Sequence, residues 1–282
     1  MPSEKRQRQD EGRLERRVAQ VSAAKKDQRR RQGRNLGILL VLLVGVGFLV
    51  SLRGAGDDDE ATTTTTAAES STTVEPATFT YGTGECPAAD GSSARTIDFE
   101  DAPQLCIDPA KTYTAVIETT KGTVTVALDT QTTPGATNNF VSLARYHYYD
   151  DTQLFRTNSE IGIIQGGSPH TQDNTDPGPG YTIPDEGFPD AVATAGSGGP
   201  FSYVAGDLVY ARPGGQPDSS SAQFFFCATD ACSGLDGQGI YIEFGHVTEG
   251  LDVLQAILGA SPEGEGRPTE PIAVTKVTIT EQ

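Results

Sequence analysis

The chain has 282 residues, of which 36% are hydrophobic and 32 are glycine, and it contains no tryptophan. This length is enough for one or two domains, and the composition favours a loop-rich globular domain with polar additions. The net charge of −17 is unevenly distributed, at +7 over residues 1–34 and −24 from Arg53 onward, so the total excludes any simple inference of a partner of one polarity.

The first element in chain order is an uncharged, apolar run over residues 36–52. As a helix it is about 25 Å long, the short end of what spans a bilayer, and we predict a transmembrane helix over residues 35–53. Arginines precede the run and acids follow it at residues 57–60, which places residues 1–34 in the cytoplasm as a basic tail and the rest outside. A cleaved signal peptide is the alternative, but the basic region is longer than usual and no clear cleavage site follows.

Polar segments flank this predicted helix. The basic tail has no interleaved aromatic residues, so we expect it to contact anionic lipid and not nucleic acid. Residues 54–76 are rich in Thr, Ser, Ala and acids and cannot bury enough apolar surface to fold alone. They are expected to form a flexible stalk.

Four cysteines lie on the predicted outer side, and an even count in an oxidising compartment favours disulfides. Proximity favours Cys86–Cys106 and Cys227–Cys232, although four cysteines allow three connectivities. Zinc is the competing interpretation, but neither spacing is CxxC and no histidine lies close to either pair. We therefore expect residues 77–112 to form a disulfide-braced segment that lies against the following domain as a lid or brace.

The folded domain is predicted over residues 113–282 and is mainly β. Residues 113–120 and 123–129 alternate around a glycine-containing turn and predict a hairpin. Thr133-Pro134 predicts a helix start with Thr as N-cap, and the spacing of Phe140 to His147 predicts one buried face. A second helix is predicted over residues 248–258. Short strands are predicted at residues 154–155, 161–165, 208–211, 223–228, 240–244 and 272–279. Together they indicate an antiparallel barrel or sandwich capped by helices.

The most informative residues are one guanidinium, two side-chain amides and a phenylalanine cluster on neighbouring predicted strands. Arg156 and Gln165 come first, and Gln223 with Phe225 follows about sixty residues later. These groups suit recognition of an apolar ring beside a polar amide, which describes a proline residue in a peptide. The region offers no carboxylate pair, metal cluster or evident nucleophile, so we expect the site to work by shape and hydrogen bonding.

From Tyr113 to about Ile279 the chain resembles a cyclophilin-type peptidyl-prolyl cis/trans isomerase. The resemblance rests on motifs in series: Asn138-Asn139-Phe140, Gln165-Gly166-Gly167, Ala222-Gln223-Phe224-Phe225, Leu235-Asp236-Gly237 and Phe244-Gly245-His246-Val247. It implies an eight-stranded antiparallel barrel closed by two helices. It also implies isomerase activity on X–Pro bonds without a cofactor.

The resemblance assigns roles residue by residue. Arg156 is expected to be the catalytic arginine and Gln165 the glutamine that supports it. The other expected substrate contacts are the pocket floor and wall, the peptide-binding strip and one aromatic position: Phe225, Leu235 and Ile163, then Gln223 with the backbone at Ala211 and Arg212, then Tyr241.

Some positions depart from the family pattern. The Arg156 to Gln165 interval is one residue longer than is common, Arg212-Pro213 replaces an Asn-containing pair, and Gly234 replaces a bulky residue. A catalytically weak module that binds Pro-containing segments, or a chaperone, is therefore the alternative. An acidic, adhesin-like barrel is a third hypothesis. The resemblance points to a bacterial protein, and we expect a membrane-anchored monomer that acts on Pro-containing segments of exported proteins at the membrane surface.

Two further features are expected to be structural. The three histidines, His147, His170 and His246, are scattered and are predicted to serve in packing or at the surface. The acidic, proline-containing segment 173–185 is predicted to be an ordered loop beside the site, and its spacing does not match an EF-hand.

Overall fold

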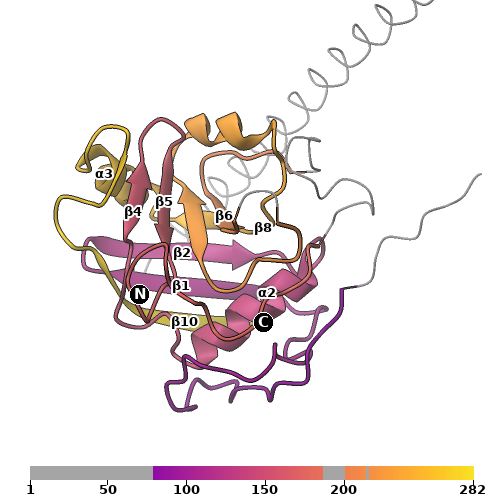
Figure 1. Ribbon diagram of the computed structural model, residues 1–282. Helices are drawn as coiled ribbons and strands as arrows, with labels where there is room; N and C mark the ends of the chain where they lie inside the picture. The colour runs from indigo at the N-terminus through magenta and orange to yellow at the C-terminus, as the bar shows by residue number, and fades with distance from the viewer. Residues whose placement is uncertain (1–78, 187–200, 214–215) are drawn as a thin grey trace, which may run out of the picture. The chain divides into compact units, whose positions relative to one another are not determined.

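The computed structural model describes residues 79–186, 201–213 and 216–282 (Figure 1). All of them belong to one compact unit, Ser71–Gln282. The predicted basic tail, transmembrane helix and stalk lie outside the described residues, as do the first two residues of the predicted brace. Among the helices in the described ranges, none combines the length and apolarity needed to cross a bilayer.

The described part of the domain is built on one antiparallel sheet. Its order is β3-β10-β1-β2-β8-β6-β7-β5-β4-β9. The strands are β1 (Tyr113–Thr119), β2 (Gly122–Leu128), β3 (Thr152–Gln153), β4 (Arg156–Asn158), β5 (Ile163–Gly166), β6 (Asp207–Tyr210), β7 (Phe224–Cys227), β8 (Glu243–Glu249), β9 (Glu265–Gly266) and β10 (Ala273–Glu281). The helices are α2 (Pro134–Arg145), α3 (Leu251–Gly259) and the 3₁₀ helix η1 (Asp230–Leu235).

The mainly β, cyclophilin-like antiparallel fold with two α-helices is confirmed, but the predicted closed barrel is refined. The two-residue strands β3 and β9 form the ends of the sheet, and among the described strands they do not pair with each other. The hydrogen-bonded sheet therefore does not close on itself, and it forms a half-barrel. It contains two short strands in addition to the eight longer ones.

The predicted hairpin is confirmed, and alternation explains it. β1 and β2 pair in register from Tyr113↔Leu128 to Thr119↔Gly122. Val124 and Val126 are fully buried, whereas Thr125 between them is half-buried and the flanking Thr123 and Ala127 are exposed. Period-two alternation of this kind places every second side chain in the core.

Helix α2 begins at Pro134 as predicted, but Thr133 does not cap it through its side chain. The Thr133 hydroxyl instead donates to the carbonyl of Glu243 at 3.0 Å. The free N–H groups of Gly135 and Ala136 donate to the two carboxylate oxygens of Glu186, at 3.0 and 2.9 Å. A carboxylate at a helix N-terminus is favourable because it meets unpaired donors and the positive end of the helix dipole.

The predicted ends of the helices need correction. Helix α2 ends at Arg145, so His147 is not on its buried face; it adopts φ +57° and its ring bonds Asp150 and the carbonyl of Gly91. Helix α3 begins at Leu251, three residues later than predicted, because β8 continues through Glu249. Gly250 separates the two with φ +87°, and a Cβ there would lie 2.3 Å from the carbonyl oxygen of Thr123. Only glycine fits this turn.

Two predicted strands are displaced. Residues 154–155 lie between β3 and β4, where the N–H of Leu154 donates to Ile272 and that of Phe155 donates to Gln165. The strand predicted at 240–244 begins only at Glu243. The remaining predicted strands are present with shifted ends.

Residues 79–112 form a strap, drawn in indigo to purple at the start of the coloured chain in Figure 1. The predicted disulfides Cys86–Cys106 and Cys227–Cys232 are both present. Asn138 of α2 accepts from the N–H groups of Cys106 and Ile107 and donates to the carbonyl of Gln104. One buried asparagine side chain of α2 thus binds the backbone of the strap.

Candidate active site

The sheet register brings three predicted site residues into one row. Arg156 on β4 is directly opposite Gln165 on β5, and Gln165 is directly opposite Phe225 on β7. Residues directly opposite each other in an antiparallel sheet project from the same face. Three segments separated in sequence therefore present a guanidinium, an amide and a phenyl ring side by side.

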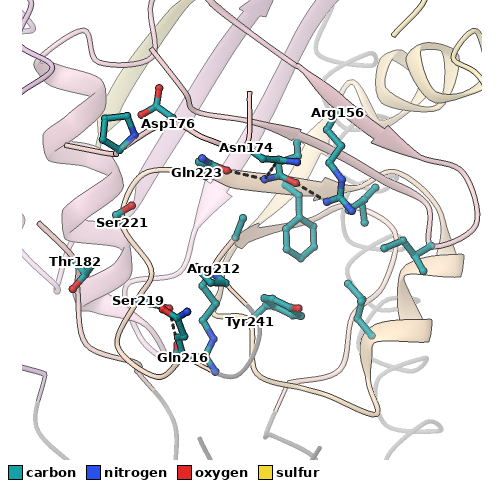
Figure 2. A pocket seen from close by; sticks show the side chains of 18 of the residues that line it. Arg156, Asn174, Asp176, Thr182, Arg212, Gln216, Ser219, Ser221, Gln223 and Tyr241 are labelled. Atoms are coloured by element: carbon teal, nitrogen blue, oxygen red, sulfur yellow. Dashed lines mark hydrogen bonds between the residues drawn. The ribbon is translucent and has the colours of Figure 1, made fainter. Parts of the chain in front are cut away.

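These residues line a cavity of about 620 Å³ (Figure 2). The structure places all nine predicted site residues on its wall: Arg156, Ile163, Gln165, Ala211, Arg212, Gln223, Phe225, Leu235 and Tyr241. Residues from several separate segments of the chain therefore meet around one cavity.

The polar side of the cavity is a chain of side-chain hydrogen bonds, drawn in part as dashed lines in Figure 2. Arg156 Nη1 donates to Gln165 Oε1 at 2.7 Å. Gln165 Nε2 donates to Gln223 Oε1 at 2.8 Å and to Asn174 Oδ1 at 3.4 Å. Arg156 Nε donates to Glu265 Oε1 at 2.8 Å. The guanidinium is therefore held from two sides, and its side chain remains 23% exposed.

The apolar side of the cavity is formed by three buried side chains. Phe225, Leu235 and Ile163 are only 3%, 8% and 2% exposed, so little of each meets solvent. The Tyr241 ring stands edge-on to the Phe225 ring, with centroids 5.8 Å apart. This surface offers an apolar ring the offset contacts that aromatic groups favour.

Alternation along β7 separates the pocket from the core. Phe225 lines the cavity, whereas the Phe224 ring packs against Phe140 and Tyr149 with centroids 6.1 and 5.5 Å apart. Phe224 also contacts the Phe226 ring on the same side of the strand. The pocket floor is therefore fixed by a packed aromatic layer directly beneath it.

The predicted peptide-binding strip is partly engaged within the protein. The N–H of Ala211 donates to the carbonyl of Gln223 at 2.8 Å. The Arg212 side chain is buried in an ion pair with Asp185. Burial raises the pKa of Asp185 despite the opposing effect of the Arg212 charge. The Gln223 side chain also lines the cavity, where its Oε1 accepts from Gln165 Nε2.

Several lining residues were not identified from the sequence. The loop 173–185 was predicted to lie beside the site, and it contributes Asn174, Asp176, Pro177, Tyr181 and Thr182. Glu265 was missed because β9 is a two-residue strand in a glycine-containing loop without any alternation. Only its tertiary pairing with β4 brings it to the cavity.

One histidine links the strap to the cavity wall. His170 Nε2 lies 3.0 Å from Asp98 of the strap, and Nδ1 lies 3.1 Å from Asp176. The Asp176 carboxylate is fully buried and also accepts from the N–H groups of His170, Thr171 and Gly178. His170 therefore does more than fill space at the surface.

We expect the pKa of His170 to depend on the strap. Partial burial opposes protonation, but hydrogen bonds to Asp176 and Asp98 outweigh it and raise the pKa above 6.5. The folding stability that protonated His170 contributes through these bonds is fully present below about pH 6.5. It is lost as the pH rises through the raised pKa of His170. An NMR titration should show a lower pKa for His170 in Asp98→Asn. The exposed Glu100→Gln serves as control, and an equal pKa in wild type and Asp98→Asn would contradict this prediction.

This fold belongs to a known class of proteins, the isomerases of the peptidyl-prolyl bond. The family model described as cyclophilin type peptidyl-prolyl cis-trans isomerase/CLD matches residues 114–279. This is more than half of the chain, so the chain belongs to the cyclophilin-type peptidyl-prolyl cis-trans isomerase family, and that is its enzyme class. The strap, residues 79–112, lies entirely outside the matched residues.

Curated relatives agree with this family. Peptidyl-prolyl cis-trans isomerase-like 1 of Gibberella zeae is 31% identical over 171 residues, covering 61% of this chain and 97% of the relative. A peptidyl-prolyl cis-trans isomerase of Helicobacter pylori is 34% identical over 150 residues, covering 52% and 82%. Peptidyl-prolyl cis-trans isomerase-like 2 of Rhizopus delemar is 31% identical over 189 residues, but the match spans only 32% of that relative and 67% of this chain.

A solved structure also resembles the chain. It is a cyclophilin type peptidyl-prolyl cis-trans isomerase from Cryptosporidium parvum, 24% identical with a TM-score of 0.47, and the match covers 61% of this chain and 99% of that one.

Proposed function

We propose that the domain isomerises X–Pro bonds of peptide segments bound in the cavity, by electrostatic stabilisation of the twisted amide. The observation that carries this proposal is the row of Arg156, Gln165 and Phe225 across three neighbouring strands. The row places hydrogen-bond donors beside an apolar floor, which is the arrangement that an amide fused to an apolar ring requires.

The chemistry needs only a lower rotational barrier. Resonance gives the C–N bond partial double-bond character and a barrier of about 18–20 kcal/mol. The cis and trans forms of an X–Pro bond differ by only about 0.5–1 kcal/mol, so no driving force has to be supplied. No bond breaks and no proton is transferred, so the site needs neither a nucleophile nor a general base.

Arg156 would act on the twisted state. Twisting localises the lone pair on the prolyl nitrogen, and a guanidinium N–H directed there stabilises that state more than the planar one. An interaction that is stronger in the transition state than in the ground state accelerates the reaction. Gln165 would hold the Arg156 fork through Nη1, while Phe225 and Leu235 hold the ring and the preceding carbonyl swings.

Exchange spectroscopy on an Ala-Pro peptide tests the proposal. Catalytic amounts of the protein should accelerate exchange between the cis and trans signals. Shift changes without acceleration would instead identify a module that binds Pro-containing segments, which is the alternative function. The absence of both shift changes and acceleration would contradict both assignments.

We further propose that this is a bacterial, membrane-anchored monomer acting on exported proteins outside the cytoplasm. The predicted transmembrane helix over residues 35–53, the charges on its two sides and the two disulfides in the residues that follow it support this location. When the full chain is expressed in a bacterium, it should be recovered with the membrane fraction. External protease should remove the domain from intact protoplasts, and protection of the domain would contradict the proposed orientation.

A further inference from the structure

The short strand β9 brings a carboxylate to the arginine of the site. β9 pairs with β4 through Thr157↔Gly266 and Asn158↔Glu265. Two further hydrogen bonds, from Ser159 N to Gly264 O at 3.0 Å and from Gly264 N to Ser159 Oγ at 2.8 Å, fasten the same segment. Glu265 is therefore placed by backbone pairing beside the strand that carries Arg156.

The contact between Glu265 and Arg156 is a charge-assisted hydrogen bond. Arg156 Nε donates to Glu265 Oε1 at 2.8 Å. The hydrogen bond and the positive charge of Arg156 lower the pKa of Glu265 below 4.5, so the carboxylate is ionised at neutral pH. Its side chain is 54% exposed, at the rim of the cavity.

The hydrogen bonds to Glu265 and Gln165 together fix the orientation of the guanidinium plane. Nε is bound to Glu265 and Nη1 to Gln165, and the planar fork cannot rotate about its stem without losing one of the two bonds. Within the described residues Arg156 Nη2 has no hydrogen-bonded protein partner, so its donors remain for a ligand.

We propose that Glu265 is a positioning residue for Arg156. This rests on the proposed function, because it assigns how the arginine of that same reaction is aimed. Glu265 does not touch the peptide bond in this account; it fixes the direction in which the free edge of the guanidinium points.

Two effects of the carboxylate oppose each other. Its charge weakens the field of Arg156 at the prolyl nitrogen, whereas its hydrogen bond aligns the donor. Exposed ion pairs interact weakly, so the effect of the Glu265 charge on the field of Arg156 changes the rate by no more than about fivefold. Misplacement of a catalytic group by about 1 Å can cost a hundredfold, so alignment is the larger effect.

Glu265→Ala and Glu265→Gln separate these effects. In Glu265→Ala we expect kcat to fall about tenfold with KM nearly unchanged, because the lost interaction matters in the transition state. Glu265→Gln keeps an acceptor oxygen and should retain most of the activity. Glu263→Ala, an exposed acid two residues away in the same loop, should match the wild type. The Nε–Hε NMR signal of Arg156 should exchange with water faster in Glu265→Ala than in Glu265→Gln.

Two results would overturn the inference. If Glu265→Ala is as fast as the wild type or faster, the carboxylate does not aim the arginine. If only KM rises, Glu265 contributes uniform binding and not positioning. Arg156→Ala, measured in parallel, distinguishes the proposed function from the role of Glu265. If exchange is slow in Arg156→Ala but normal in Glu265→Ala, only the role of Glu265 is rejected. Failure of the wild type to accelerate exchange rejects the proposed function itself.

Discussion

Replacing Arg156 by alanine is expected to lower kcat for isomerisation about a hundredfold, because removal of one preorganised donor costs about 2.7–4 kcal/mol. The fold should persist, since the side chain is 23% exposed and supports the site and not the aromatic core. Exchange spectroscopy gives the rate, and a thermal unfolding scan shows whether the variant is folded.

Two further variants sharpen this test. Arg156→Lys keeps the charge but not the planar fork that bonds both Gln165 and Glu265, so its activity should lie between wild type and Arg156→Ala. Arg267→Ala removes an exposed cation that does not line the cavity, and it should leave the rate unchanged. A folded Arg156→Ala with near-normal turnover would refute the assigned role.

Removing the Cys86–Cys106 disulfide should lower the free energy of unfolding by about 3 kcal/mol in the chain-entropy model, because the bond closes a loop of about twenty residues. For a domain of this size, the thermal midpoint should fall by about 6–12 °C. Calorimetry on Cys86→Ser/Cys106→Ser measures the change.

The same variant tests whether the strap acts on stability or on the reaction. Contacts such as the Phe99 N–H to the carbonyl of Pro179 do not involve the disulfide, so kcat of the folded variant should remain near that of the wild type. A reductant should shift its midpoint less than that of the wild type, because only Cys227–Cys232 remains to be reduced. An unchanged midpoint in the double variant would show that the strap does not depend on this bond.

The sequence predicts the central row of the site because strong local patterns mark β5 and β7, two of its three strands. Gln165 and Phe225 lie in short apolar strands, and period-two alternation fixes the direction of Phe225. Arg156 begins the polar strand β4, which directly follows the predicted strand at residues 154–155. The family resemblance then assigned the roles of these residues, which propensity alone does not indicate.

Contacts made by irregular segments were beyond such reasoning. Glu186 caps α2 from about fifty residues away in sequence, and Glu265 reaches Arg156 only because β9 pairs with β4. The late start of α3 has a similar cause, because the approach of Gly250 to Thr123 is a tertiary contact. Chain length, charge and periodicity do not predict these tertiary contacts.

A structure of the protein bound to an Ala-Pro-containing peptide tests the account most directly. The prolyl ring should rest on Phe225 and Leu235, with a free guanidinium N–H of Arg156 about 3 Å from the prolyl nitrogen. A ring bound elsewhere, or an Arg156 head group turned away from the ligand on the Phe225 floor, would contradict it.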